Sequence, residues 1–61
     1  MDQFLANIYQ TEDGMYHFMG EMFSGTRFTE YADPMSYKTE AEAKKALEHF
    51  CVERGCTLEI K

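Results

Sequence analysis

Residues 39–55 read T-E-A-E-A-K-K-A-L-E-H-F-C-V-E-R-G, and this stretch decides the fold because its start, body and end all predict one helix. Thr39 followed by Glu42 is a capping box, in which the threonine hydroxyl accepts from a backbone N–H of the first turn. Gly55 can adopt the left-handed conformation that commonly ends helices. The sequence therefore predicts a helix over about residues 39–54.

The apolar side chains of this helix recur at the spacing of a single helical face. They are Ala43, Ala46, Leu47, Phe50 and Cys51. Their i, i+3, i+4, i+7 spacing predicts a stripe that must be buried against another element. Only a sheet made from the rest of the chain can supply that surface.

Two turn sequences divide the chain before the helix into three predicted strands. Asp13-Gly14 and Ser24-Gly25 mark these turns, because glycine adopts positive φ angles without strain. Pro34 ends the last strand, since proline cannot donate to a ladder of hydrogen bonds. The predicted strands cover residues 3–10, 15–23 and 26–32.

The alternation of apolar and polar residues resumes after the helix. Leu58 and Ile60 alternate with polar neighbours, which predicts a short strand over about residues 57–61. The chain of 61 residues is thus expected to form a single small α+β domain, residues 1–61, with the order β-β-β-α-β. We expect a three-stranded antiparallel meander, one helix packed on one sheet face, and a C-terminal strand.

One helix covers only one face of a sheet, whereas the second predicted strand is largely apolar or aromatic on both faces. The chain holds five Phe, four Tyr and five Met, which is more than one helix can cover. Large exposed apolar patches mark interaction sites, so we expect the uncovered face to bind a second copy of the chain or another protein. The residues predicted for this interface are Tyr9, Met15, His17, Met19, Phe23 and Tyr31. The complementary set takes this role if the helix covers the other face.

The charge balance disfavours nucleic acid as a partner. Six basic residues stand against eleven acidic ones, for a net charge of −5, whereas phosphate recognition depends on Lys and Arg. Tyr16, Phe18 and Phe28 could stack on bases, but only Arg27 accompanies them on the strands. The chain shows neither an apolar run of about 20 residues nor a signal peptide, so we expect no membrane association, a cytoplasmic location and reduced thiols.

The few residues suited to catalysis or metal binding do not form a recognisable motif. A zinc site would need both cysteines, Cys51 and Cys56, together with His17 and His49 from separate elements. A disulfide across the Gly55 turn is an alternative that a cytoplasmic location disfavours. We expect packing roles for both cysteines, no metal and no cofactor. Neither histidine has a nucleophile or an orienting carboxylate at a recognisable spacing, so the chain is predicted not to be an enzyme.

The segment Y-K-T-E-A-E-A-K-K-A-L-E at residues 37–48, joined to three predicted strands, resembles small bacterial and phage modules in which a Thr-capped helix follows a β-meander. One such group is the arm-type DNA-binding domain of tyrosine recombinases. Another is a set of short bacterial proteins with a final strand after a helix-ending glycine, as in R-G-C-T-L-E-I at residues 54–60. The resemblance covers the helix and its flanks and implies the fold. It does not extend to DNA binding, because arm-type domains need basic strands and these strands are acidic.

Two functional hypotheses follow. The leading one is a non-enzymatic protein-interaction module of bacterial or phage type, homodimeric through the uncovered sheet face. The alternative is a small acidic phage-type inhibitor that imitates nucleic acid and blocks a nucleic-acid-handling protein. The carboxylates proposed for such mimicry are Glu40, Glu42, Glu48 and Glu53 of the helix. The interspersed Lys44, Lys45 and Arg54 weaken that alternative.

Overall fold

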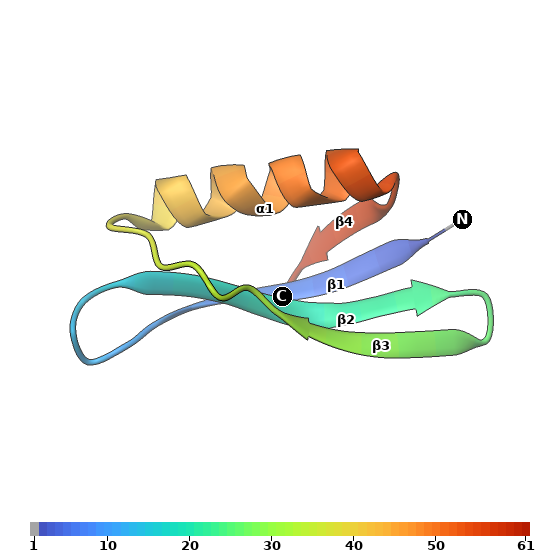
Figure 1. Cartoon of the computed structure of the whole chain (residues 1–61), viewed down its shortest axis with the longest axis horizontal. Coiled ribbons are helices and arrows are strands. Elements are labelled where there is room, and N and C mark those ends of the chain that lie inside the picture. Colours follow the sequence, from blue (N-terminus) through green and yellow to red (C-terminus); the bar gives the residue numbers. More distant parts are fainter. Residues whose placement is uncertain (1) are drawn as a thin grey trace.

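The computed structural model describes residues 2–61 and places one helix across one face of a four-stranded sheet (Figure 1). The elements in chain order are β1 (Gln3–Gln10), β2 (Tyr16–Ser24), β3 (Arg27–Ala32), α1 (Glu40–Arg54) and β4 (Thr57–Ile60). This arrangement confirms the predicted α+β fold, its β-β-β-α-β order and its antiparallel meander.

The strands lie in the order β3-β2-β1-β4 across the sheet. β1 pairs antiparallel with β2, and β2 with β3, whereas β4 pairs parallel with β1. A parallel strand needs a crossover connection. In this chain α1 is that connection, because it carries the chain from the β3 edge over the sheet to the opposite edge (Figure 1).

The two ends of α1 have the caps that the sequence predicts. The Thr39 hydroxyl accepts from the backbone N–H of Glu42 (3.1 Å) and donates to its carboxylate (3.3 Å). Gly55 has a φ of 70°, and the N–H of Cys56 donates to the carbonyl of Cys51 (3.1 Å). This left-handed turn ends the helix and directs the chain at once into β4.

The core lies between α1 and the sheet, where the predicted helical stripe is buried. The buried side chains are Phe4, Ala6, Phe18, Ala43, Leu47 and Cys51. Half-buried side chains surround them, among them Phe50 and Tyr31. One face of the sheet is thus closed by the helix and the other is left without a covering element (Figure 1).

Gly20 allows β1 and β2 to pack closely beneath the helix. A Cβ atom at Gly20 would lie 2.4 Å from the carbonyl oxygen of Leu5 and 2.9 Å from a ring carbon of Phe4. The register runs without a break from the Gln3–Phe23 pair to the Gln10–Tyr16 pair. Of the two roles that a glycine inside a strand suggests, a bulge or a close approach, the structure shows the close approach.

The segment between β3 and α1, residues 33–38 (the linker), leaves the sheet and then returns to it. The N–H of Asp33 still donates to the carbonyl of Phe18 (3.1 Å). After Pro34 the backbone of Tyr37 exchanges two hydrogen bonds with Tyr16, at 2.7 and 2.9 Å. The Tyr37 hydroxyl donates to the Asp33 carboxylate (2.6 Å), which closes the linker into a compact loop beside the helix.

Candidate functional site

The face of the sheet turned away from α1, here called the open face, presents alternate side chains of all four strands. On β1 and β2 these residues alternate with Phe4, Ala6 and Phe18, which point to the helix. The cross-strand register arranges them in four rows. The rows are Phe28–Phe23–Gln3–Thr57, Glu30–Glu21–Leu5–Glu59, Ala32–Met19–Asn7 and His17–Tyr9. The open face therefore has apolar side chains on both sides of an acidic row.

The aromatic row lies next to the turn that joins β2 and β3. The rings of Phe23 and Phe28 stack with centroids 5.8 Å apart and planes at 21°. Phe28 is 58% exposed and Phe23 is 37% exposed. Two large rings stacked on each other and open to water form an apolar surface that a second protein can cover.

The acidic row crosses the sheet from edge to edge. Glu21 on β2 lies directly opposite Glu30 on β3, and Glu59 on β4 continues the row beyond Leu5. Like charges directly opposite each other on neighbouring strands destabilise a sheet. Lys61 relieves part of this repulsion, since its Nζ lies 3.7 Å from Oε1 of Glu21.

The row nearest the β1–β2 turn joins an aromatic ring to a histidine. The rings of Tyr9 and His17 stack with centroids 5.3 Å apart, and Nε2 of His17 lies 3.1 Å from Oγ1 of Thr11. The Asp13 carboxylate accepts from the Thr11 hydroxyl and from the N–H of Met15, and these hydrogen bonds lower the pKa of Asp13. His17 is half-buried, and its contacts stabilise the turn.

The structure separates the six residues predicted for the interface. Tyr9, His17, Met19 and Phe23 share the open face, and Met15 lies just before β2, where its carbonyl accepts from the N–H of Thr11 (2.9 Å). Tyr31 was wrongly included in this set. It lies opposite Gly20 on the covered face and packs against the core, because strand alternation places it opposite in facing to Phe28.

Phe28 is the most exposed aromatic residue of the open face, at 58%, and the predicted interface omits it. The alternation of β3 already separates it from Tyr31, so the signal was present in the sequence. Only its pairing with Phe23 places it on the open face, and this pairing follows from the register of the β2–β3 turn.

The cysteines take the packing positions expected for them, and His49 lies on the exposed surface of α1. Cys51 is buried and Cys56 is half-buried, and both are free thiols. Burial raises the pKa of Cys51 to about 12, and the adjacent Cys56 thiol adds to the shift. His49 is exposed and pairs with Glu53 on the helix. Among residues 2–61 no three potential ligand side chains come together to hold a metal ion.

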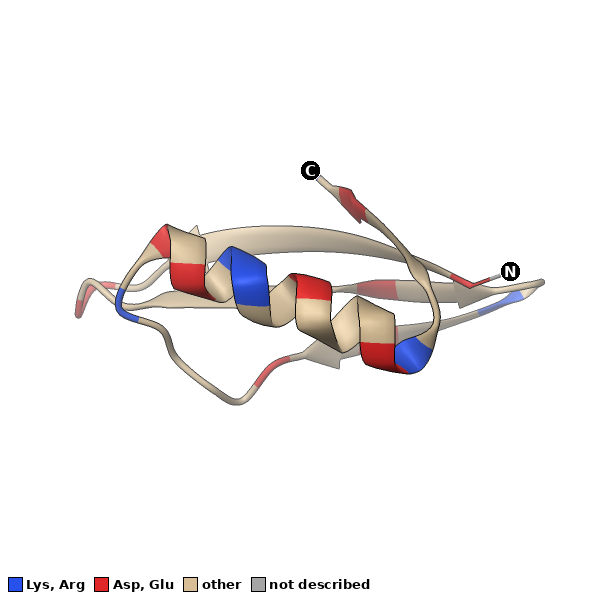
Figure 2. Ribbon diagram, turned by 90° about the horizontal axis from the view of Figure 1, so that it is seen from above, with Lys and Arg blue, Asp and Glu red and all other residues tan. Residues whose placement is uncertain are grey.

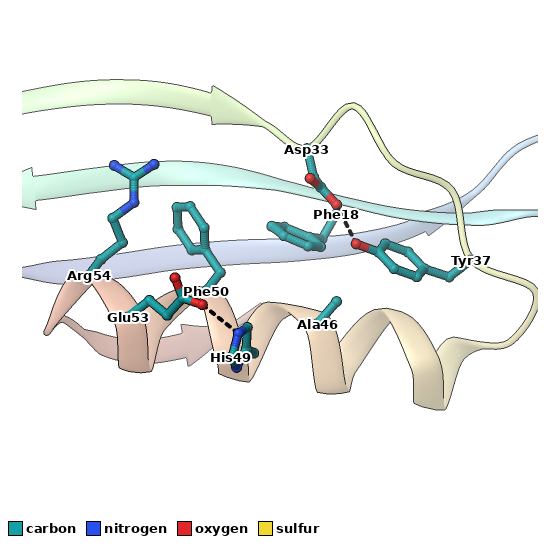
Figure 3. A pocket seen from close by; sticks show the side chains of 8 residues that line it. All are labelled: Phe18, Asp33, Tyr37, Ala46, His49, Phe50, Glu53 and Arg54. Carbon is teal, nitrogen blue, oxygen red and sulfur yellow. Dashed lines mark hydrogen bonds and ion pairs between the residues drawn. The ribbon is translucent and has the colours of Figure 1, made fainter.

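A second feature is a groove between α1 and the linker, with a volume of about 270 Å³. Phe18, Tyr37 and Phe50 line its apolar part, and the carboxylates of Asp33 and Glu53 lie at its rim (Figure 3). No pattern in the sequence predicts this groove. It exists because the linker returns to β2 at Tyr37, and the local sequence carries no signal for that contact.

Comparison with known proteins finds no matching protein family, no matching curated protein and no matching solved structure. Within residues 2–61, no helix has the length and apolar character needed to cross a membrane. The open face is accordingly the feature from which a function can be inferred.

Proposed function

We propose that the protein is a non-enzymatic interaction module whose open face binds a second copy of the same chain. The observation that carries this proposal is the set of large apolar side chains exposed on one continuous sheet surface. Phe28 is 58% exposed, Met19 40%, and Phe23 and Tyr9 each 37%. Large exposed apolar side chains gathered on one sheet face, here on both sides of the acidic row, are typical of a surface that a partner covers.

The size of the domain also favours association. Only six apolar side chains are buried in residues 2–61, and a chain this short gains little stability from its own core. The molecule measures 37 × 18 × 18 Å. One sheet face of these dimensions matches the roughly 600 Å² per partner found at the low end of stable interfaces.

The order of the rows makes the open face complementary to itself. A two-fold axis that runs across the strands, between the acidic row and the Met19 row, would place each acidic row on the Met19 row of the other copy. Glu59 of one copy would then face Lys61 of the other. Phe23 of one copy would lie over His17 of the other, and Gln3 over Tyr9. Such an isologous arrangement avoids stacking like charges on each other.

Sedimentation equilibrium from micromolar to millimolar concentration tests the proposal. We expect the mass to approach twice the 7.1 kDa of one chain. Phe23→Lys on the open face should shift the equilibrium to the monomer. Val52→Lys is the matched control, because Val52 is 78% exposed on the helix, away from the open face. A mass of one chain throughout the concentration range would contradict the dimer.

A second candidate function, an acidic inhibitor of a nucleic-acid-handling protein, is favoured by one observation. Glu21, Glu30 and Glu59 lie in one row across the sheet. The outer surface of α1 suits mimicry less well, because acidic and basic residues alternate along it (Figure 2). A complex with a basic partner that dissociates with added salt, and that Glu21→Gln weakens, would favour this function over a salt-insensitive dimer.

A further inference from the structure

β3 is an edge strand whose outer side has no partner within residues 2–61. The sheet order β3-β2-β1-β4 places it at one border of the sheet, and no described element lies beyond it (Figure 1). The strand runs from Arg27 to Ala32, and every residue in it except Tyr31 is exposed. An exposed edge strand is a template on which another extended chain can pair.

The hydrogen bonds with β2 show which backbone groups of β3 remain free. The N–H of Asp33 donates to the carbonyl of Phe18 (3.1 Å), so these two residues form a hydrogen-bonded pair. Hydrogen-bonded pairs alternate with non-bonded pairs along an antiparallel ladder. The residues at the intervening positions, whose N–H and C=O groups point away from β2, are Phe28, Glu30 and Ala32. These groups are free to pair with a further strand.

The side chains of the same three residues lie on the open face, and the central one is charged. Glu30 lies directly opposite Glu21 of β2. The ammonium group of Lys61 lies 3.7 Å from the Glu21 carboxylate, whereas no Lys, Arg or His among residues 2–61 forms an ion pair with Glu30. The outer edge of β3 therefore has a carboxylate at its centre that the described chain leaves without a positive partner.

This carboxylate disfavours a second copy of the chain as the additional strand. Antiparallel pairing of two β3 strands about their centres would place Glu30 of each copy directly opposite Glu30 of the other. Like charges in directly opposite positions destabilise a sheet, whereas opposite charges stabilise it. The edge of β3 is therefore suited to a strand that has a positive charge where a second copy would have a negative one.

We propose that the edge of β3 binds an extended segment of another protein, antiparallel to β3, with a Lys or Arg opposite Glu30. Main-chain hydrogen bonds supply the affinity in this mode of recognition, and alternate side chains supply the specificity. The neighbours of Phe28 and Ala32 on the added strand would be apolar, because the Phe28 ring is 58% exposed and stacks on Phe23. The recognised pattern is thus apolar–x–basic–x–apolar. This interaction goes beyond the proposed dimer, because it uses backbone groups at the edge of the sheet.

An NMR titration with two synthetic peptides tests this proposal. The probe is acetyl-Thr-Val-Thr-Lys-Thr-Phe-Thr-amide, and the control peptide has Glu in place of Lys. We expect the Lys peptide to slow hydrogen exchange at the amides of Phe28, Glu30 and Ala32. It should bind about fivefold more tightly than the Glu peptide, because opposite and like charges in a cross-strand pair differ by about 1 kcal/mol.

Methylation of single backbone nitrogens in the probe tests whether the peptide pairs as a strand. The backbone N–H of its lysine would donate to β3, so methylation of that nitrogen should abolish binding. The backbone N–H of the threonine after the lysine would point away from β3. Methylation of that nitrogen is the matched control and should leave binding unchanged.

A charge reversal on the protein tests the pairing with Glu30. Glu30→Lys should reverse the preference, so that the Glu peptide binds more tightly than the Lys peptide. Glu59→Lys is the matched control, because it makes the same change of charge in the same acidic row at the opposite edge of the sheet. This control variant should still prefer the Lys peptide, and the amide spectrum reports that both variants keep the fold.

Four results would overturn the proposal. Equal affinity for the Lys and Glu peptides would show that the edge does not recognise a positive charge. Equal effects of Glu30→Lys and Glu59→Lys would identify attraction to the net charge alone. Equal losses from the two methylations, or slowed exchange in β4 instead of β3, would show that the peptide does not pair with β3. Slowed exchange of the β3 amides at raised protein concentration without peptide would identify a second copy as the occupant.

Discussion

The ring of Tyr31 stacks on the ring of Phe50, with centroids 4.6 Å apart and planes at 23°. Tyr31 belongs to the edge strand β3 and Phe50 to α1, so this contact joins the helix to the strand most distant from β4. Arg54 extends the contact, since its Cζ lies 6.0 Å from the Tyr31 centroid. This contact is possible because strand alternation places Tyr31 on the covered face of the sheet.

Loss of either ring of this pair should destabilise the fold. We expect Tyr31→Ala and Phe50→Ala each to lower the free energy of unfolding by about 2 kcal/mol, because both side chains are half-buried against the core. The double variant should show a coupling of about 1 kcal/mol. Urea denaturation of the two single variants and the double variant measures these losses. Met35→Ala serves as the control, since Met35 is 60% exposed, and purely additive losses would contradict direct stacking.

Gly20→Ala should destabilise the sheet through a steric clash. The new Cβ would meet the backbone of Leu5 and Ala6 at 2.4 and 2.9 Å, and these backbone atoms cannot move without breaking the ladder. We expect a loss of about 2–3 kcal/mol, measured by thermal or urea unfolding. In Gly14→Ala the new methyl group meets nothing within 4 Å, and strain at a φ of 86° is its only penalty.

The comparison of Gly20→Ala with Gly14→Ala separates the free-energy cost of a steric clash from that of backbone strain. Gly14→Ala should lose only about 1 kcal/mol, the usual penalty for a left-handed residue with a side chain. If the two substitutions had equal effects, the close approach of β1 to Gly20 would not be the reason for the glycine.

Tyr37 should ionise later than an ordinary tyrosine. Burial, the hydrogen bond to Asp33 and the charge of Asp33 raise its pKa from 10.0 to about 12. The pKa of Tyr37 is higher in the folded protein than in the unfolded chain. The protonated Tyr37 hydroxyl therefore contributes fully to the free energy of unfolding below pH 10, and this contribution is lost as the pH rises towards 12. An ultraviolet titration of the phenolate band should show one late step. Tyr37→Phe should remove that step and Asp33→Asn should lower its midpoint, whereas a late step that persists in Tyr37→Phe would contradict the assignment.

The two thiols should differ in reactivity. Cys51 is 4% exposed and its pKa is raised to about 12 by burial, whereas Cys56 is half-buried just before β4. A thiol reagent should therefore modify one cysteine per chain in the native protein and the second only as the protein unfolds. Mass spectrometry across a urea series measures this order. Cys56→Ala should leave the native protein unreactive, and rapid modification of that variant would show that Cys51 is accessible.

Local sequence patterns were sufficient to predict the helix and the strands, but not every contact between these elements. The helix could be predicted because Thr39, the apolar stripe and Gly55 each act within a few residues of one another. The zinc alternative illustrates the limit, because the local sequence places His49 on the helix but does not show that His17 lies on the sheet face turned away from that helix. The interface prediction failed at Tyr31 for a similar reason. A count of exposed aromatic residues does not show which strand face the helix covers.

The sequence by itself determined which residues form strands and helix, where each element ends, and which side chains share a face of each strand. These properties depend on backbone propensity, capping and alternation, all of which act between near neighbours in the chain. The tertiary structure decided that β4 pairs parallel with β1, that Phe28 stacks on Phe23, and that Tyr37 returns to β2 and forms the groove. These contacts join residues distant in sequence or on different elements, so their energies depend on the packing of the helix against the sheet as a whole.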